Sequence, residues 1–375
     1  VTDDQHTCVS EYGQSGHRSF VARLNRPSYK RSRPIYSRLR TRAVRDLRAR
    51  VQYVMSQPDP SRADAPSLSH PRHWPSWTLV GLGRLLARLP WRAQMRLGAR
   101  LGRLARHIVR DRARVAAINL SLCYPERTSA ERKTLLDAHF AYVGQGALET
   151  VFCWWGRQAD IDGLADIEGL HHLEDAAMRG RGIILLSAHT TSLELGVRMA
   201  RPYMQALGYT TTAMYKPPHD PVIDHVMRTR RETHIGGATI ADNDIGGLMA
   251  ALRRGEAVWY AADQKAGKRV SVTVDFFGQP ARTHVAISRV AKMTRATVVP
   301  FFTLRRADGR GYRLIVKPAL TDFPSGDEAA DAQRINHLIE DVVNEDPAQY
   351  FWLHQRFKRK KFDPYKRDAS KKAVS

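Results

Sequence analysis

The sequence GIILLSAHTTSLE, residues 182–194, decides the fold class. Its opening apolar run, residues 183–186, is typical of a buried β-strand, and a helical pattern begins near Thr191. The imidazole of His189 stands between them, five residues before the carboxylate of Glu194. On one continuous helix, positions five apart lie roughly 140° from each other, so these side chains would not meet. With His189 in the turn before the helix, Glu194 points back toward it from the first helical turn.

Glu194 also has a purely structural interpretation. The run Thr191-Ser192-Leu193-Glu194 fits a capping box, in which the threonine and the glutamate satisfy backbone groups at the start of a helix. That interpretation leaves unexplained why a histidine follows directly on a buried strand. The sequence therefore keeps two hypotheses for Glu194, a partner of His189 and a helix cap.

Beyond residue 126, apolar segments of strand length alternate with helical patterns. The strand candidates are 183–187, 210–215, 257–261, 297–303 and 312–317. The helix candidates are 192–206, 221–231, 245–253, 284–293 and 328–344. A capping box from Thr128 to Glu131 opens a further helix that runs to about Phe152. This alternation predicts an α/β fold in which helices flank a mostly parallel or mixed sheet.

The composition narrows the classes of partner. The 375 residues are 43% hydrophobic, which suffices for one large core with appendages. The formal net charge of +23 indicates an anionic partner, either nucleic acid, an anionic membrane surface, or acidic proteins and phosphorylated ligands. The three cysteines, Cys8, Cys123 and Cys153, have neither CxxC nor metal-site spacing, which favours reduced thiols on the cytosolic side.

Four parts are predicted along the chain. They are a basic mobile arm over residues 1–70, amphipathic membrane-docking helices over 71–125, a catalytic domain over 126–365 and a basic tail over 366–375. Residues 1–35 lack the apolar core of a signal peptide. No run of 18 uncharged apolar residues occurs, so no clear transmembrane helix is expected.

The membrane-docking prediction rests on two neighbouring stretches. Trp74 and Trp77 stand at one end of a short apolar stretch that ends near Leu89. Six arginines then fall within about 120° of one helical face: Arg92, Arg96, Arg100, Arg103, Arg106 and Arg110. Leu97, Leu101, Leu104 and Ile108 fall on the other side. A helix of this kind lies in an anionic membrane surface; the alternative is an ordinary surface helix with a solvated arginine face.

A histidine held by a carboxylate is a general base. No GxSxG elbow, P-loop or GxGxxG is present, and no cysteine has the context of a nucleophile. The pattern therefore favours a base that activates the hydroxyl of an incoming substrate. HxxxxE differs from the zinc motif HExxH, so neither a metal nor a cofactor is expected.

Further polar residues follow other predicted strands. Asp263 follows strand 257–261, Tyr215 and Lys216 end strand 210–215, and Arg231 ends the next helix. In open α/β sheets, ligands bind beyond the carboxyl ends of the strands, which makes these residues site candidates. Each also has a structural explanation, Asp263 as a turn residue and Arg231 as a cation at a helix C-terminus.

These residues together resemble a known family. The stretch 74–364 is similar to the lipid A biosynthesis late acyltransferases, the Kdo-dependent lauroyl and myristoyl transferases, within the lysophospholipid acyltransferase superfamily and its His-x-x-x-x-Asp/Glu motif. The pieces that carry the resemblance are 189–196, Tyr215-Lys216-Pro217, 255–264, Phe276-Phe277-Gly278, Val299-Pro300-Phe301 and 352–358.

The resemblance implies a glycerolipid-acyltransferase-like fold and a set of site residues. His189 and Glu194 match the catalytic dyad, Arg231 a functional arginine and Asp263 a functional aspartate. Six residues are implied to bind substrate: Tyr215, Lys216, Phe276, Phe277, Arg356 and Lys358.

The resemblance also implies the reaction. A fatty acyl chain passes from acyl carrier protein to the hydroxyl of a 3-hydroxyacyl chain on a lipid A precursor, as Glu194 orients His189 and no covalent enzyme intermediate forms. The implied partners are acyl carrier protein, the lipid A precursor and anionic inner-membrane lipid, at the cytoplasmic face of a bacterial inner membrane, with attachment through residues 74–110. Two alternatives stay open: a glycerophospholipid or other lipid acyltransferase that uses acyl-CoA, and a basic nucleic-acid-binding protein.

Overall fold

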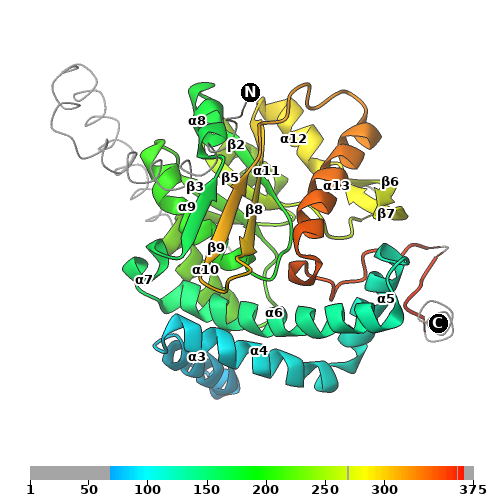
Figure 1. Cartoon of the computed structure of the whole chain (residues 1–375). Helices are drawn as coiled ribbons and strands as arrows, with labels where there is room; N and C mark the ends of the chain where they lie inside the picture. The colour runs from blue at the N-terminus through cyan, green and yellow to red at the C-terminus, as the bar shows by residue number, and fades with distance from the viewer. Residues whose placement is uncertain (1–67, 268–269, 361, 367–375) are drawn as a thin grey trace, which may run out of the picture. The chain divides into compact units, whose positions relative to one another are not determined.

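A seven-stranded sheet forms the centre of the described part of the chain (Figure 1). The structure is a computed structural model, and it describes residues 68–267, 270–360 and 362–366. The strand order is β1 (Ala165–Glu168), β9 (Tyr312–Val316), β8 (Thr297–Arg305), β2 (Ile183–Ser187), β5 (Ala257–Ala261), β3 (Thr211–Tyr215) and β4 (Gly236–Ala241). Neighbouring strands run parallel except β8 and β9, which are antiparallel. The predicted mixed, mostly parallel sheet is confirmed.

Strand prediction succeeded where strands are fully buried. β2 and β5 have the predicted bounds, and all five residues of β2 are buried. The short edge strands β1 and β4 were missed, because only alternate residues of each are shielded and their apolar signal is weak. A separate antiparallel hairpin, β6 (Ser271–Phe276) and β7 (Gln279–His284), was also missed.

Helices cover both faces of the sheet. Along β2, Ile184 and Leu186 pack on one side with α11 (Ile245–Arg253), α12 (Ala286–Thr294) and α13 (Glu328–Glu345). Ile183 and Leu185 pack on the other side with α8 (Leu170–Met178), α9 (Leu193–Ala206) and α10 (Pro221–Ile235). Because a strand's side chains alternate between faces, an uninterrupted apolar run belongs in a sheet buried on both sides.

The longest described helix, α6 (Ser129–Trp155), runs beneath the sheet, and the N-terminal helices pack against it (Figure 1). Its predicted capping box is confirmed: Thr128 Oγ1 accepts from the Glu131 amide at 3.3 Å, and Glu131 Oε2 accepts from the Thr128 amide at 2.7 Å. The helices before it are α3 (Trp74–Leu86), α4 (Trp91–Ile108) and α5 (Arg110–Cys123). The short elements η3 (Pro71–His73), α7 (Gln158–Asp162) and η5 (Pro347–Gln349) complete the described helices.

Glycines let α4 lie against α6 with backbones almost in contact. A Cβ added to Gly102 would overlap the carbonyl oxygen of Phe140, and one added to Gly144 would overlap that of Gly98. Met95 and these small residues therefore form the face of α4 that packs on α6.

The large apolar residues in the second half of α4 do not lie on its buried face. Leu101, Leu104 and Ile108 are 47%, 58% and 73% exposed, although leucines on a simple surface helix would face the core. Leu79, Leu82 and Leu85 of α3 are exposed as well. None of the helices in the described ranges combines the length and apolar composition that a bilayer-spanning segment needs.

Several predictions lie outside the described residues. They concern the arm up to residue 67, Cys8 and the basic tail from residue 367.

Candidate active site

Two adjacent strands deliver His189 and Asp263 to the same point. β2 and β5 are parallel neighbours whose last residues, Ser187 and Ala261, are paired in register. His189 and Asp263 each lie two residues beyond that pair. The Nδ1 atom of His189 is 2.7 Å from Asp263 Oδ1, and the His189 backbone amide donates to the same oxygen at 3.0 Å. Strand register therefore determines which carboxylate meets the histidine.

The Asp263 carboxylate is held ionised. Its side chain is 1% exposed, so burial by itself would raise the pKa of this carboxyl. The imidazole of His189, and to a smaller degree His354 and Tyr350, lower the pKa of Asp263 well below its usual value instead. An anionic Asp263 that accepts from Nδ1–H leaves the Nε2 atom of His189 as the basic nitrogen. Among the described residues, no hydrogen-bond partner of Nε2 is present.

The C-terminal segment holds the His189 turn in place. The Phe351 amide donates to the His189 carbonyl at 2.9 Å, and the Thr191 amide donates to the Gln349 carbonyl at 2.8 Å. Thr190 forms an isolated β-bridge with Tyr350. The turn is therefore fixed on both sides, by Asp263 at the imidazole and by residues 349–351 along the backbone.

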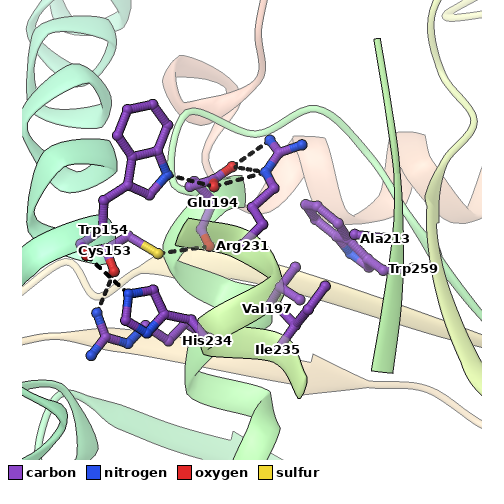
Figure 2. Close-up of a pocket in the computed structure, with 10 residues that line it drawn as sticks. Cys153, Trp154, Glu194, Val197, Ala213, Arg231, His234, Ile235 and Trp259 are labelled. Atoms are coloured by element: carbon purple, nitrogen blue, oxygen red, sulfur yellow. Dashed lines mark hydrogen bonds and ion pairs between the residues drawn. The ribbon is translucent and has the colours of Figure 1, made fainter. Parts of the chain in front are cut away.

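The predicted pairing of His189 with Glu194 is not what the structure shows. Glu194 Oε1 accepts from Arg231 Nε at 2.8 Å and from Trp154 Nε1 at 3.0 Å, and its Oε2 accepts from Arg231 Nη2 at 2.5 Å (Figure 2). The first turn of α9 directs this side chain between α6 and α10 rather than back toward the strand end. The carboxylate that orients His189 is Asp263.

The capping-box hypothesis for Glu194 is also wrong. Ser192 occupies the N-cap of α9 and makes no side-chain capping bond; its hydroxyl donates to the Thr303 carbonyl at 3.1 Å. Burial would raise the pKa of Glu194, but Arg231 outweighs it and the pKa lies below its usual value. The structure therefore contains an ion pair, Glu194 with Arg231, in addition to the hydrogen-bonded His189–Asp263 pair.

The Glu194–Arg231 pair borders a small cavity (Figure 2). Its volume of about 10 Å³ is close to the space of one water molecule. Cys153 and Trp259 line it too, and the Arg231 guanidinium lies 6.0 Å from the centre of the Tyr215 ring. This cavity is too small for a substrate, whereas a second space that Glu194 lines, on its other side, is larger.

That other side is a groove of about 350 Å³ between α6 and the segment 189–195. Both His189 and Glu194 line it. Most of the other lining side chains are small or apolar: Val143, Gly146, Ala147, Leu193, Leu195 and Phe351. An apolar groove with a histidine base at its wall suits a substrate that has a long aliphatic part and one reactive polar group.

A buried ion pair that was not predicted from the sequence lies beside the groove. Arg305 and Glu149 are 6% and 1% exposed, and their Nη2 and Oε2 atoms are 2.5 Å apart. Arg305 Nη1 donates to Thr191 Oγ1 at 2.5 Å, which ties β8 to the His189 turn. Tyr312 donates to Glu149 Oε1 at 2.5 Å. The sequence feature that could have indicated this pair is the arginine at the end of an apolar strand. It was missed because β8 was predicted to end at Thr303, two residues before Arg305.

The residues implied to bind substrate lie apart from the groove, and none of the six lines it. Phe276 and Arg356 are 0% and 1% exposed, and the Arg356 guanidinium stacks over the Phe276 ring at 4.9 Å. Both side chains therefore take part in core packing in this structure, and their contact with substrate stays a prediction. Phe277 packs against the rings of Tyr124 and Trp352.

Lys358 and Lys216 lie nearer the surface. The Lys358 ammonium pairs with Asp363 at 3.1 Å, and Lys216 is exposed directly after β3. Tyr215, at the end of β3, lies with its ring against the Arg231 guanidinium.

The two described cysteines are poor nucleophiles here. Cys123 and Cys153 are buried free thiols, and burial raises the pKa of each. Cys153 Sγ donates to the Glu194 carbonyl at 3.4 Å. Within the described ranges, no group of three or more histidine, cysteine or acidic side chains is arranged to hold a metal ion.

Comparisons with known proteins agree on one family. The sequence model of the bacterial lipid A biosynthesis acyltransferases matches residues 62–359. The lipid A biosynthesis lauroyltransferase of Escherichia coli (strain K12) is 35% identical over 293 residues, which cover 78% of this chain and 94% of the relative. The palmitoleoyltransferase of the same strain is 33% identical over 290 residues, covering 77% and 92%. The myristoyltransferase is 33% identical over 307 residues, covering 80% and 93%.

Proposed function

The chain belongs to the bacterial lipid A biosynthesis acyltransferase family, and from this premise we propose that it moves a fatty acyl chain from acyl carrier protein to a hydroxyl on a lipid A precursor. The acceptor hydroxyl belongs to a 3-hydroxyacyl chain. The observation that carries this proposal is the His189–Asp263 pair at the wall of an apolar groove.

His189 acts as the general base. Nε2 takes the proton of the acceptor hydroxyl while Asp263 holds Nδ1–H and stabilises the imidazolium that forms. The hydroxyl oxygen attacks the thioester carbonyl carbon, and the resulting tetrahedral intermediate loses its C–S bond. The departing thiolate takes the proton from His189, which restores the neutral base. No covalent bond to the protein forms, in keeping with the raised pKa of both buried thiols.

Glu194 and Arg231 act on this reaction through position. Their bidentate ion pair joins the first turn of α9 to α10, and Trp154 joins both to α6. The first turn of α9 lines the groove, so its backbone amides are candidates for stabilising the oxyanion of the intermediate. Nε and Nη2 of Arg231 both donate to Glu194, so an oxyanion role for Arg231 would fall to its Nη1 atom.

The membrane contact rests on α3 and α4. Both helices expose leucine side chains to water, which is energetically unfavourable for a contiguous apolar patch. They are Leu79, Leu82 and Leu85 of α3 and Leu101 and Leu104 of α4. A leucine stripe beside arginines is the pattern of a helix that lies in the membrane interface. We place the protein at the cytoplasmic face of the inner membrane, in contact through residues 74–110, where an acceptor lipid is accessible.

One assay separates the candidate functions. Purified protein is given an acyl thioester of acyl carrier protein or of coenzyme A, with a lipid A precursor or a lysophospholipid as acceptor, and products are identified by mass spectrometry. The proposal predicts transfer from the carrier protein to the lipid A precursor. Transfer only from coenzyme A to the lysophospholipid would establish the glycerolipid alternative. Tight, salt-dependent DNA binding without any transfer would establish the nucleic-acid-binding alternative.

A further inference from the structure

A cleft lined by arginines lies beside the groove, between α4 and the turn that joins β8 to β9. Its volume is about 440 Å³. Its cationic side chains are Arg92, Arg96, Arg100 and Arg103 of α4 and Arg310 of the turn. Gln145 of α6 lines the cleft, and the next residue, Gly146, lines the groove that contains His189. The two spaces are therefore neighbours along α6.

We propose that this cleft binds the phosphate groups of a phosphorylated lipid headgroup, an inference that rests on the membrane contact proposed above. The apolar stripe of α4, formed by the exposed Leu101, Leu104 and Ile108, contacts the bilayer. The cleft binds the headgroup phosphate beside the catalytic groove.

The first reason is uncompensated charge. Within the described residues, no carboxylate lies within ion-pair distance of the five guanidinium groups. The one acidic residue of the cleft, Asp308, is already bound: its carboxylate accepts from Arg306 Nη2 at 2.8 Å and from the Arg310 amide at 2.9 Å. Five like charges that converge on one cavity repel one another until an anion enters.

The second reason is the chemistry of the cationic groups. All five are arginines, whose planar guanidinium forms paired hydrogen bonds with phosphate oxygens, whereas lysine offers a point charge. They also come from two elements that face each other, α4 and the β8–β9 turn. Groups that approach from two sides can surround a compact anion, which a single helical face cannot do.

The third reason is the position of α4 relative to the proposed membrane surface. Around the circumference of this helix, the arginines of the cleft lie next to the exposed residues Leu101, Leu104 and Ile108. Gly98 and Gly102 face α6. When the leucines lie in the acyl-chain boundary, the arginines lie at the level of the phosphates. This favours a lipid headgroup over an acidic protein as the ligand.

Single substitutions that remove equal charge test the site. Arg96→Gln and Arg310→Gln each remove one charge from the cleft, and Arg84→Gln removes one from an exposed part of α3 outside it. All three side chains are exposed, and circular dichroism verifies that each variant folds. Binding is measured to phosphatidylcholine vesicles that contain phosphatidic acid, and to vesicles with the same surface charge supplied by oleate.

The cleft variants should bind phosphatidic acid vesicles more than about fivefold more weakly than the parent, because each loses the charge effect of one arginine at an anionic surface and also its hydrogen bonds to phosphate. Arg84→Gln should lose at most about fivefold, the charge effect alone, because Arg84 lies on the proposed membrane surface but outside the cleft. The parent should prefer phosphatidic acid to oleate vesicles, because carboxylate reproduces the charge but not the phosphate. Equal losses in all three variants, or equal binding to both vesicle types, would mean diffuse attraction and would overturn the proposal.

A second measurement works without a membrane. Inorganic pyrophosphate is titrated into the full chain, and its binding should be weakened by Arg96→Gln and Arg310→Gln but not by Arg84→Gln. Saturating pyrophosphate should also compete with phosphatidic acid vesicles. Pyrophosphate binding without any preference for phosphatidic acid vesicles would identify a free phosphate ligand and overturn the lipid assignment. Neither probe depends on acyl transfer, so failure of the proposed reaction is recognised separately.

Discussion

His189 Nδ1 lies 2.7 Å from Asp263 Oδ1, although the two residues are 74 positions apart in the sequence. The contact exists because β2 and β5 are adjacent, parallel and in register at Ser187 and Ala261. The carboxylate five residues after the histidine, Glu194, instead forms an ion pair with Arg231. The site thus contains two pairs, the hydrogen-bonded His189–Asp263 pair and the Glu194–Arg231 ion pair, in place of one His189–Glu194 pair.

This arrangement predicts an order of effects on turnover. His189→Ala should lower kcat by roughly 10²–10⁴-fold, the usual contribution of a general base. Asp263→Asn should also lower kcat strongly, because it removes the carboxylate that accepts the hydrogen bond from His189 Nδ1–H. Glu194→Gln should affect kcat less and stability more, since it leaves Arg231 without its counter-charge. Rates are compared after correction for the folded fraction. An inactive, well-folded Glu194→Gln protein beside an active Asp263→Asn protein would restore the His189–Glu194 hypothesis.

Breaking the buried pair of Arg305 and Glu149 should destabilise the protein. Glu149→Gln or Arg305→Met alone leaves one buried charge uncompensated, which typically costs about 3–5 kcal/mol. The double variant should recover part of this loss, because no unpaired charge remains. Urea unfolding of the two single variants and the double variant measures the recovery. Additive losses in the double variant would show that the two side chains act independently.

Gly102→Ala should weaken the packing of α4 on α6. A methyl group there overlaps the Phe140 carbonyl oxygen, and overpacking of this kind costs about 1–3 kcal/mol or more. Gly81→Ala is the matched control on α3, where a Cβ meets nothing within 4 Å. That substitution should raise helix stability by about 1 kcal/mol or less. Thermal unfolding should therefore separate the two variants in opposite directions.

Stability should fall as the pH drops from about 6.5 toward 4, in part through His139. This side chain is fully buried, and its Nδ1 lies 3.0 Å from the Ala348 carbonyl. Burial lowers the pKa of His139 to about 4, only partly offset by that hydrogen bond. Below the ordinary pKa of 6.5 the unfolded chain binds a proton that the folded protein does not accept, so stability declines until the pH reaches the folded value.

The expected contribution of His139 across that interval is on the order of 3 kcal/mol. His139→Gln should reduce the slope of unfolding free energy against pH between 6.5 and 4, whatever its effect on stability at pH 7. Urea unfolding at several pH values gives both slopes. Parallel slopes in parent and variant would show that His139 does not titrate in this interval.

The apolar stripe should contribute to membrane binding at every salt concentration. Leu101→Ser with Leu104→Ser should weaken vesicle binding equally at low and high salt, because burial of apolar surface is not screened. Folding should be preserved, since both side chains are exposed. Flotation with vesicles at several salt concentrations measures binding, and circular dichroism monitors the helix. Unchanged binding would move the membrane contact away from α4.

The sequence alone determined the local elements of the catalytic domain. The apolar run before His189 predicted β2 with its observed bounds, and the run 257–261 predicted β5 in the same way. Thr128 and Glu131 predicted the start of α6. These features depend on neighbours a few residues apart, so short-range patterns suffice to identify them. The family followed from motifs of the same local kind.

Only the tertiary structure decided which of these elements meet. The order β8–β2–β5–β3 across the sheet differs from the order along the chain, and it is this order that gives His189 the carboxylate of Asp263. Likewise, the amphipathic pattern of α4 predicted two faces, but the glycine contact with α6 exposes Leu101 and Leu104 to solvent. Contacts between distant segments depend on strand register and on close backbone approach, and neither leaves a periodic signal in one sequence.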